Sequence, residues 1–230
     1  MENGTFIQKI RGGLIVSCQA LDDEPLYGTG MMPLMARAVA IGGAVGIRAN
    51  GADDIRKIKA EVAMPLIGIV KRNYAGSPVY ITPTFKEVEE VAHAGADVVA
   101  LDATSRTRPG GETLEALVRR IRAAFPELLI MADVSTLEEG LTAAGLGVDV
   151  VASTLSGYTP YSPQRTEPDF ALIESLVRNT GKPVIAEGRI HTPDEALRCI
   201  QLGCVAVVVG SAITRPQEIT RLFVEKMRDF

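Results

Sequence analysis

The chain has 230 residues, of which 47% are hydrophobic and 23% are charged, and its formal net charge is −4. This composition is that of a globular protein with a sizeable core, and the length suits one α/β barrel. The negative charge argues against a nucleic-acid or anionic-membrane partner, and no run approaches the roughly 18 apolar residues of a membrane span. Three cysteines without CxxC spacing fit a reducing compartment, so we expect a cytoplasmic protein.

Eight short apolar segments are predicted to be buried strands. In chain order they are GLIVSCQA from residue 13, GGAVGIRA from 42, PLIGIVKR from 65, AGADVVALDAT from 94, LLIMADVS from 128, LGVDVVASTLS from 146, KPVIAEGR from 182 and LGCVAVVVGSA from 202. Every second segment opens with a helix-ending glycine, and these glycines lie 52, 52 and 56 residues apart: Gly43, Gly95, Gly147 and Gly203.

The connecting segments carry the start signals of helices. Capping boxes are predicted at Thr84 with Glu87, at Ser135 with Glu138 and at Thr192 with Glu195. Strand and helix thus alternate eight times without a linker, which predicts a closed (β/α)8 TIM barrel, with residues 1–230 as a single domain. A doubly wound open sheet is the alternative, but it would need a switch point and typically has five to seven strands.

Polar side chains stand where nearly every predicted strand ends. In barrels of this kind the chemistry lies at the carboxyl ends of the strands, so these side chains are expected to meet at one rim. They are Gln19, Arg48, Lys71, Asp102, Asp133, Thr154, Ser156, Glu187, Arg189 and Ser211, with Gly210 beside Ser211 at the last strand end.

The last two strands end in small residues that suit an anion. Gly188, Gly210 and Ser211 would let backbone N–H groups approach a phosphate. Lys71 is the best candidate for a base, because burial and neighbouring cations would lower the pKa of its amine. These features indicate proton abstraction next to a carbonyl on a phosphorylated small molecule, with Glu187 and Asp133 as proton donor or orienting groups.

A metal ion is not expected. The two histidines have no partner at ligand spacing. Asp102, Asp133 and Glu187 could bind Mg²⁺, but Lys71 and the arginines would compete for them. Cys18 is expected to be a buried small hydrophobe rather than a nucleophile.

The segments GLIVSCQ, GIRANG, PLIGIVKR, ALDATSRTRP, MADVST, TLSGYT, VIAEGRIHTP and VGSAITRP together resemble the bacterial N-acetylmannosamine-6-phosphate 2-epimerases, from about residue 12 to residue 216. The resemblance implies a TIM barrel that interconverts N-acetylmannosamine 6-phosphate and N-acetylglucosamine 6-phosphate in amino-sugar and sialic-acid breakdown, without a metal or another cofactor. It implies Lys71 and Glu187 as catalytic residues. Substrate-binding positions would be Gln19, Arg48, Asp133 and Arg215, with phosphate at Gly188, Gly210 and Ser211.

Other readings of the same residues remain open at this stage. A Schiff-base aldolase or a phosphosugar isomerase would use Lys71 on a carbonyl instead of a C–H bond. A catalytically silent phosphosugar-binding protein would keep the glycines but lose the acid–base pair, and the presence of both Lys71 and Glu187 speaks against it. The partner is expected to be a phosphorylated amino sugar, a homodimer is possible, and the sequence leaves one-base and two-base proton transfer undecided.

Overall fold

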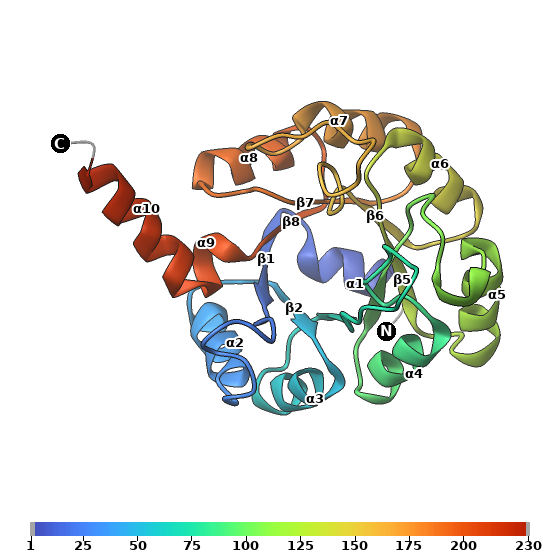
Figure 1. Ribbon diagram of the computed structural model, residues 1–230, viewed down its shortest axis with the longest axis horizontal. Helices are drawn as coiled ribbons and strands as arrows, with labels where there is room; N and C mark the ends of the chain where they lie inside the picture. Colours follow the sequence, from blue (N-terminus) through green and yellow to red (C-terminus); the bar gives the residue numbers. More distant parts are fainter. Residues whose placement is uncertain (1–2, 229–230) are drawn as a thin grey trace.

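The computed structural model describes residues 3–228, and its eight strands form a closed barrel in the order β1 to β8, every neighbouring pair parallel (Figure 1). The TIM barrel predicted from the sequence is therefore confirmed. The strands are β1 (Gly13–Cys18), β2 (Gly46–Asn50), β3 (Leu66–Ile69), β4 (Val98–Asp102), β5 (Leu129–Asp133), β6 (Val150–Ala152), β7 (Val184–Glu187) and β8 (Ala206–Val209).

The helices that follow the first seven strands cover the outer wall of the barrel (Figure 1). They are α2 (Met32–Ile41), α3 (Ala52–Glu61), α4 (Phe85–His93), α5 (Leu114–Ala124), α6 (Leu137–Gly145), α7 (Phe170–Asn179) and α8 (Pro193–Gln201), with the 3-10 turn η1 (Pro109–Gly111) before α5. The predicted capping boxes at Thr84 and Thr192 are present. The third was placed one residue early: Thr136 caps α6, and its partner is Glu139.

The strand residues divide between two apolar layers, because successive side chains point to opposite faces of a strand. In β4, Val99 and Leu101 pack outward against the helices, whereas Val98 and Ala100 fill the barrel interior. The helix α1 (Asn3–Ile10), which the sequence analysis did not assign, adds Phe6 to this interior layer. Figure 1 shows α1 lying across the barrel, so it closes the end of the barrel opposite the carboxyl ends of the strands.

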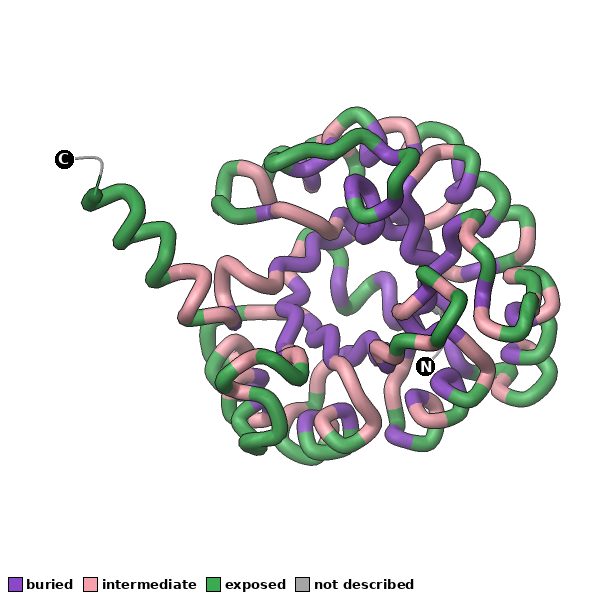
Figure 2. Tube along the Cα trace, in the orientation of Figure 1, coloured by how far each residue is buried: buried purple, intermediate pink, exposed green. Residues whose placement is uncertain are grey.

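The carboxyl-terminal segment departs from the regular pattern. A short helix α9 (Ser211–Thr214) follows β8, and α10 (Pro216–Arg228) then runs away from the barrel instead of covering its wall (Figure 1). Its surface is exposed along most of its length, including the apolar side chains of Leu222, Phe223 and Met227 (Figure 2). The helices within residues 3–228 are all too short or too polar to cross a membrane.

Candidate active site

A cavity of about 550 Å³ opens at the carboxyl ends of the strands. Eight of the nine site residues implied by the sequence line it: Gln19, Arg48, Lys71, Glu187, Gly188, Gly210, Ser211 and Arg215. The ninth, Asp133, is fully buried directly beside the cavity, in contact with Arg48. Residues that lie up to 196 positions apart in the sequence are thus gathered at one rim, as the barrel topology requires.

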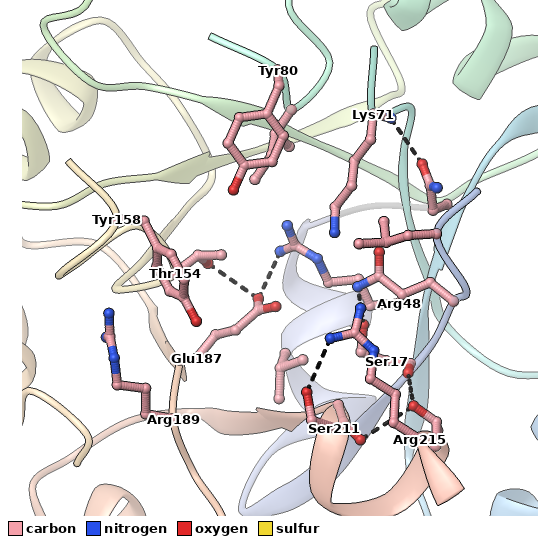
Figure 3. A pocket seen from close by; sticks show the side chains of 18 of the residues that line it. Ser17, Arg48, Lys71, Tyr80, Thr154, Tyr158, Glu187, Arg189, Ser211 and Arg215 are labelled. Atoms are coloured by element: carbon pink, nitrogen blue, oxygen red, sulfur yellow. Dashed lines mark hydrogen bonds and ion pairs between the residues drawn. The ribbon is translucent and has the colours of Figure 1, made fainter. Parts of the chain in front are cut away.

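An ion-pair network forms the floor of the cavity. Arg48 is 1% exposed, and its Nη2 and Nη1 atoms lie 2.6 and 3.2 Å from the two carboxylate oxygens of Asp133. The Nη1 atom also lies 2.7 Å from Oε2 of Glu187. The Thr154 hydroxyl lies 2.8 Å from Asp133 Oδ1 and 3.1 Å from Glu187 Oε2. Such a bidentate pair fixes the guanidinium plane. The guanidinium in turn holds the Glu187 carboxylate (Figure 3).

The sequence analysis placed Arg48 at a strand end, and this was wrong. Arg48 is the middle residue of β2, and Asn50 ends that strand. A buried mid-strand arginine is expensive unless it is paired, and the two carboxylates provide that pairing. Asn50 lines the cavity as well, and its Oδ1 atom accepts the backbone N–H of Lys71 at 2.8 Å.

The amine of Lys71 projects into the cavity from the residue pair that follows β3 (Figure 3). Burial is the largest cause of a lowered pKa, which falls to about 8, and the positive charges of Arg48 and Arg215 lower it further. A substantial fraction of this amine is therefore neutral near physiological pH. Only the neutral amine can accept a proton.

Arg72 is also among the residues that line the cavity, but its guanidinium is directed away to α4. Its guanidinium pairs with Glu87 and Glu90 on α4, the second at 2.9 Å. The two cations that end PLIGIVKR therefore have separate tasks, because Lys71 faces the cavity and Arg72 ties the loop to a helix.

Glu187, at the end of β7, has a pKa raised to about 7. Burial is the main cause and the charge of Asp133 adds to it, whereas Arg48 opposes the shift. Its backbone is held by Ser153, whose hydroxyl lies 3.1 Å from the Glu187 N–H and 2.9 Å from the Glu187 carbonyl oxygen. The cavity thus contains a carboxyl group and an amine that both exchange protons close to neutral pH.

The opposite side of the cavity carries small residues and one arginine. Gly188 has a φ of +109°, a conformation that favours glycine. Arg215 lies 3.3 Å from the Ser211 hydroxyl through Nη1 and 2.7 Å from Glu24 through Nε. Glu24 was not among the expected site residues. It joins the loop after β1 to this edge of the cavity.

Comparisons with known proteins agree with this geometry. The model of one family, described as "Putative N-acetylmannosamine-6-phosphate epimerase", matches residues 32–229. The chain belongs to this family. A relative from Caldanaerobacter subterraneus subsp. tengcongensis, named "Putative N-acetylmannosamine-6-phosphate 2-epimerase", is 55% identical over 97% of this chain and 94% of its own. A Clostridium perfringens relative with the same name is 53% identical over 97% of this chain and all of its own.

A solved structure described as the N-acetylmannosamine-6-phosphate 2-epimerase from Clostridium perfringens is 52% identical. It superimposes with a TM-score of 0.92 over 95% of each chain. A thiamine phosphate pyrophosphorylase from Pyrococcus furiosus shares only the fold, at 20% identity and a TM-score of 0.58. The epimerase family membership therefore agrees with the fold and extends over nearly the whole chain.

Three residues expected at the rim do not line the cavity: Asp133 beside it, Ser156, whose hydroxyl donates to Asp169 at 2.8 Å, and Asp102. Asp102 ends β4, but its carboxylate pairs with Arg106 and accepts the Thr104 hydroxyl at 2.6 Å. The loop after β4 therefore uses Asp102 for its own structure. Within residues 3–228, no three histidine, cysteine or acidic side chains gather as metal ligands would. That the reaction needs no metal stays a prediction.

Cys18 is buried, and burial raises the pKa of its thiol to about 12. This confirms its interpretation as a small core residue.

Tyrosines around the cavity were not predicted from the sequence. Tyr80, Tyr158 and Tyr27 all line it; Tyr158 belongs to the segment TLSGYT, but none of the three was among the expected site residues. Arg189, which has a φ of +55°, stacks over the Tyr158 ring at 4.4 Å and lies 2.6 Å from the Ser156 carbonyl oxygen.

Proposed function

We propose that the protein interconverts N-acetylmannosamine 6-phosphate and N-acetylglucosamine 6-phosphate by removing and returning the proton at C2, with Lys71 and Glu187 as its catalytic residues. The observation that carries this proposal is the amine of Lys71, with a pKa of about 8, facing the same cavity as a carboxyl group whose pKa is about 7. The relatives that cover nearly the whole chain are named for this activity.

The chemistry requires an acidic C–H bond. In the open-chain sugar C2 is bonded to the aldehyde carbon, so loss of its proton gives an enolate. Neutral Lys71 accepts that proton, and return of a proton to the other face of C2 inverts the centre. Glu187 is placed to exchange a proton with a substrate oxygen, and Gln19 and Arg48 to contact the sugar. Asp133 supports the site through Arg48, because its oxygens are engaged by Arg48 and Thr154.

The phosphate is proposed to lie at Gly188, Gly210 and Ser211, next to Arg215. Small residues let an anion reach backbone N–H groups, and a guanidinium matches phosphate geometry. The helix α9 has only four residues, so local N–H groups and Arg215 matter more here than a helix dipole.

This function is tested by NMR of the purified protein in D₂O. With N-acetylmannosamine 6-phosphate we expect conversion to the C2 epimer with deuterium at C2 of the product. Unphosphorylated N-acetylmannosamine should react at least about 10²-fold more slowly, because the binding energy of the remote phosphate is missing. No C2 exchange on the phosphorylated sugar would contradict the proposed reaction, and equal turnover of both sugars would contradict the phosphate site.

We further propose that the protein is a homodimer that buries α10. Phe223 and Met227 are 68% and 76% exposed in the single chain, and Leu222 lies beside them. Burying such side chains stabilises an assembly by about 1.5–3 kcal/mol each. Ile41 of α2 and Leu197 of α8, the helices that flank the point where α10 leaves the barrel, are also exposed (Figure 1). A second copy offers apolar surface of the same kind.

Sedimentation velocity at micromolar concentration tests the homodimer. The unchanged protein should sediment as a dimer, and the double change Phe223→Asp with Met227→Asp should give monomers. Leu141→Asp, at another exposed apolar position on α6, is the matched control and should leave the dimer intact. A monomeric unchanged protein would contradict this assignment.

Two broader expectations are retained as proposals. Residues 1–230 are proposed to be one barrel domain, and the protein is proposed to act in the cytoplasm, where phosphorylated sugars are kept.

A further inference from the structure

Tyr80 lies at the cavity, and its ring directs the hydroxyl inward, towards the space between Lys71 and Glu187 (Figure 3). The ring itself is half-buried against the apolar interior layer of the barrel. No hydrogen bond joins this hydroxyl to any of the residues drawn in Figure 3, so it is free to bind a ligand. The epimerase reaction as described above assigns it no task.

The backbone on both sides of Tyr80 is fixed. Residues 70–82 turn back on themselves after β3, and Lys71 pairs with Ile81 in an antiparallel bridge. The Arg72 N–H donates to the Tyr80 carbonyl oxygen at 2.9 Å. Lys71 and Tyr80 are therefore on opposing arms of one hairpin, and neither can move without disturbing the other.

Thr82 holds the two arms of this hairpin together where they meet the barrel. It is fully buried and has a φ of +43°, a left-handed conformation that is strained for a β-branched residue. Its N–H donates to the Val70 carbonyl oxygen at 2.8 Å, and its hydroxyl donates to the Ala100 carbonyl oxygen at 2.7 Å. A strained backbone conformation of this kind persists only where surrounding contacts, such as these hydrogen bonds, hold it in place. Such conformations occur preferentially at functional sites.

The position of the phosphate orients the sugar with respect to Tyr80. In Figure 3, Ser211 and Arg215 lie on the side of the cavity opposite to Tyr80. A phosphosugar that binds with its phosphate at Ser211 therefore extends C1 and C2 towards Tyr80 and Lys71. This step rests on the proposed function, because it uses the proposed phosphate site.

We propose that the Tyr80 hydroxyl donates a hydrogen bond to the C1 oxygen of the open-chain substrate and stabilises the negative charge that develops there. In this step the C2–H bond breaks, its proton moves to the Lys71 amine, and the electron pair is delocalised through C1 onto the C1 oxygen. Reprotonation of C2 on its other face, by the Lys71 ammonium in a one-base reaction or by a second acid in a two-base reaction, reverses the electron flow and restores the aldehyde. Tyr80 keeps its own proton throughout, so the balance of the reaction is unchanged.

The cationic alternative for this task is already engaged. The Nη atoms of Arg48 are held by Asp133 and Glu187, so only its buried Nε atom, which has no hydrogen-bond partner among the described residues, is left to contact the sugar. Burial raises the pKa of Tyr80 to about 12, which keeps the phenol protonated over the range in which Lys71 titrates. A fixed neutral donor of this kind is worth about 10²–10³-fold in kcat when it faces a developing oxyanion.

The test is Tyr80→Phe, with Tyr74→Phe as its matched control. Tyr74 is on the same hairpin, but its hydroxyl donates to Glu87 on α4 at 2.8 Å, away from the cavity. We expect Tyr80→Phe to lower kcat by about 10²-fold with KM changed less than about threefold. With C2-deuterated substrate its primary isotope effect on kcat should be at least that of the unchanged enzyme, since the donor acts in the C–H step. Tyr74→Phe should retain near-normal kcat.

Three outcomes would overturn the proposal while leaving the epimerase function intact: equal kcat values for the two variants, a loss confined to KM, or loss of the isotope effect in Tyr80→Phe. Should Tyr80→Phe fail to fold, as judged by circular dichroism, 3-fluorotyrosine at position 80 keeps the ring and supplies a more acidic phenol. A kcat that responds to this acidity supports the donor, and a kcat that does not respond overturns it. Inactivity of the unchanged enzyme would instead contradict the proposed function.

Discussion

Replacing Lys71 with alanine is expected to lower kcat by about 10²–10⁴-fold or more, the usual contribution of a positioned acid–base group. Lys71 is the only amine among the described residues that line the cavity, where the other basic side chains are the permanently charged guanidinium groups and one imidazole. The variant should still fold. The backbone N–H of residue 71 can still donate to Asn50. The lysine side chain that is removed projects into the cavity and does not pack in the apolar core.

Two measurements isolate the role of Lys71 as the base. In D₂O the unchanged enzyme should place deuterium at C2, and Lys71→Ala should not. Arg72→Ala is the neighbouring control: it removes ion pairs to Glu87 and Glu90, so it should lower thermal stability but cost far less in kcat. Near-normal C2 exchange in Lys71→Ala would show that the base lies elsewhere. Trapping of a covalent Lys71 adduct by borohydride would instead support the Schiff-base alternative.

The barrel could be predicted from the sequence because its signals are local and repeated. Each strand is a short apolar run, and glycines such as Gly95 and Gly147 mark the same point in successive units. The periodicity failed at the two ends of the chain. The helix α1 closes the barrel by tertiary packing of Phe6, which no local pattern reveals. The position of α10 away from the wall likewise follows no rule of periodicity.

The candidate site was predictable to the extent that polar residues stand at the ends of apolar strands. Lys71 and Glu187 carry that signal and line the cavity. Arg48 lies two residues inside its strand, where only the carboxylates of other strands make its burial possible, so its location could not be read locally. Asp102 stands at a strand end and yet does not line the cavity, because its carboxylate pairs with Arg106, four residues further along the chain.

Replacing Glu187 with glutamine is expected to lower kcat by about 10²-fold or more, because the amide keeps the shape of the side chain but can no longer give or take a proton. The fold should survive, since Arg48 keeps its bidentate pair with Asp133. Glu187→Asp is the matched control. It retains a carboxyl group one methylene further from the substrate, so it should lose rate while keeping a pH dependence that the amide lacks.

The pH profile of kcat/KM is expected to show which protonation state of Lys71 and of Glu187 is the active one. Lys71 must be neutral, and its neutral fraction falls as pH drops below its pKa of about 8. Glu187 acts as the proton donor and must be protonated, and its protonated fraction falls as pH rises above its pKa of about 7. The two requirements together give a bell with its maximum between about pH 7 and 8.

In Glu187→Gln the alkaline limb of this bell should vanish, and kcat/KM should rise with pH to a plateau. The remaining limb should follow the titration of Lys71 alone, with a pKa below about 8, because the negative charge of Glu187 that raises the pKa of Lys71 in the unchanged enzyme is gone. Initial rates of C2 epimerisation, measured from about pH 5.5 to about pH 9.5 in both proteins, check this prediction. Both pKa values, about 8 for Lys71 and about 7 for Glu187, lie inside that range. A bell that persists in Glu187→Gln would assign the alkaline limb to another group and remove Glu187 from the role of proton donor.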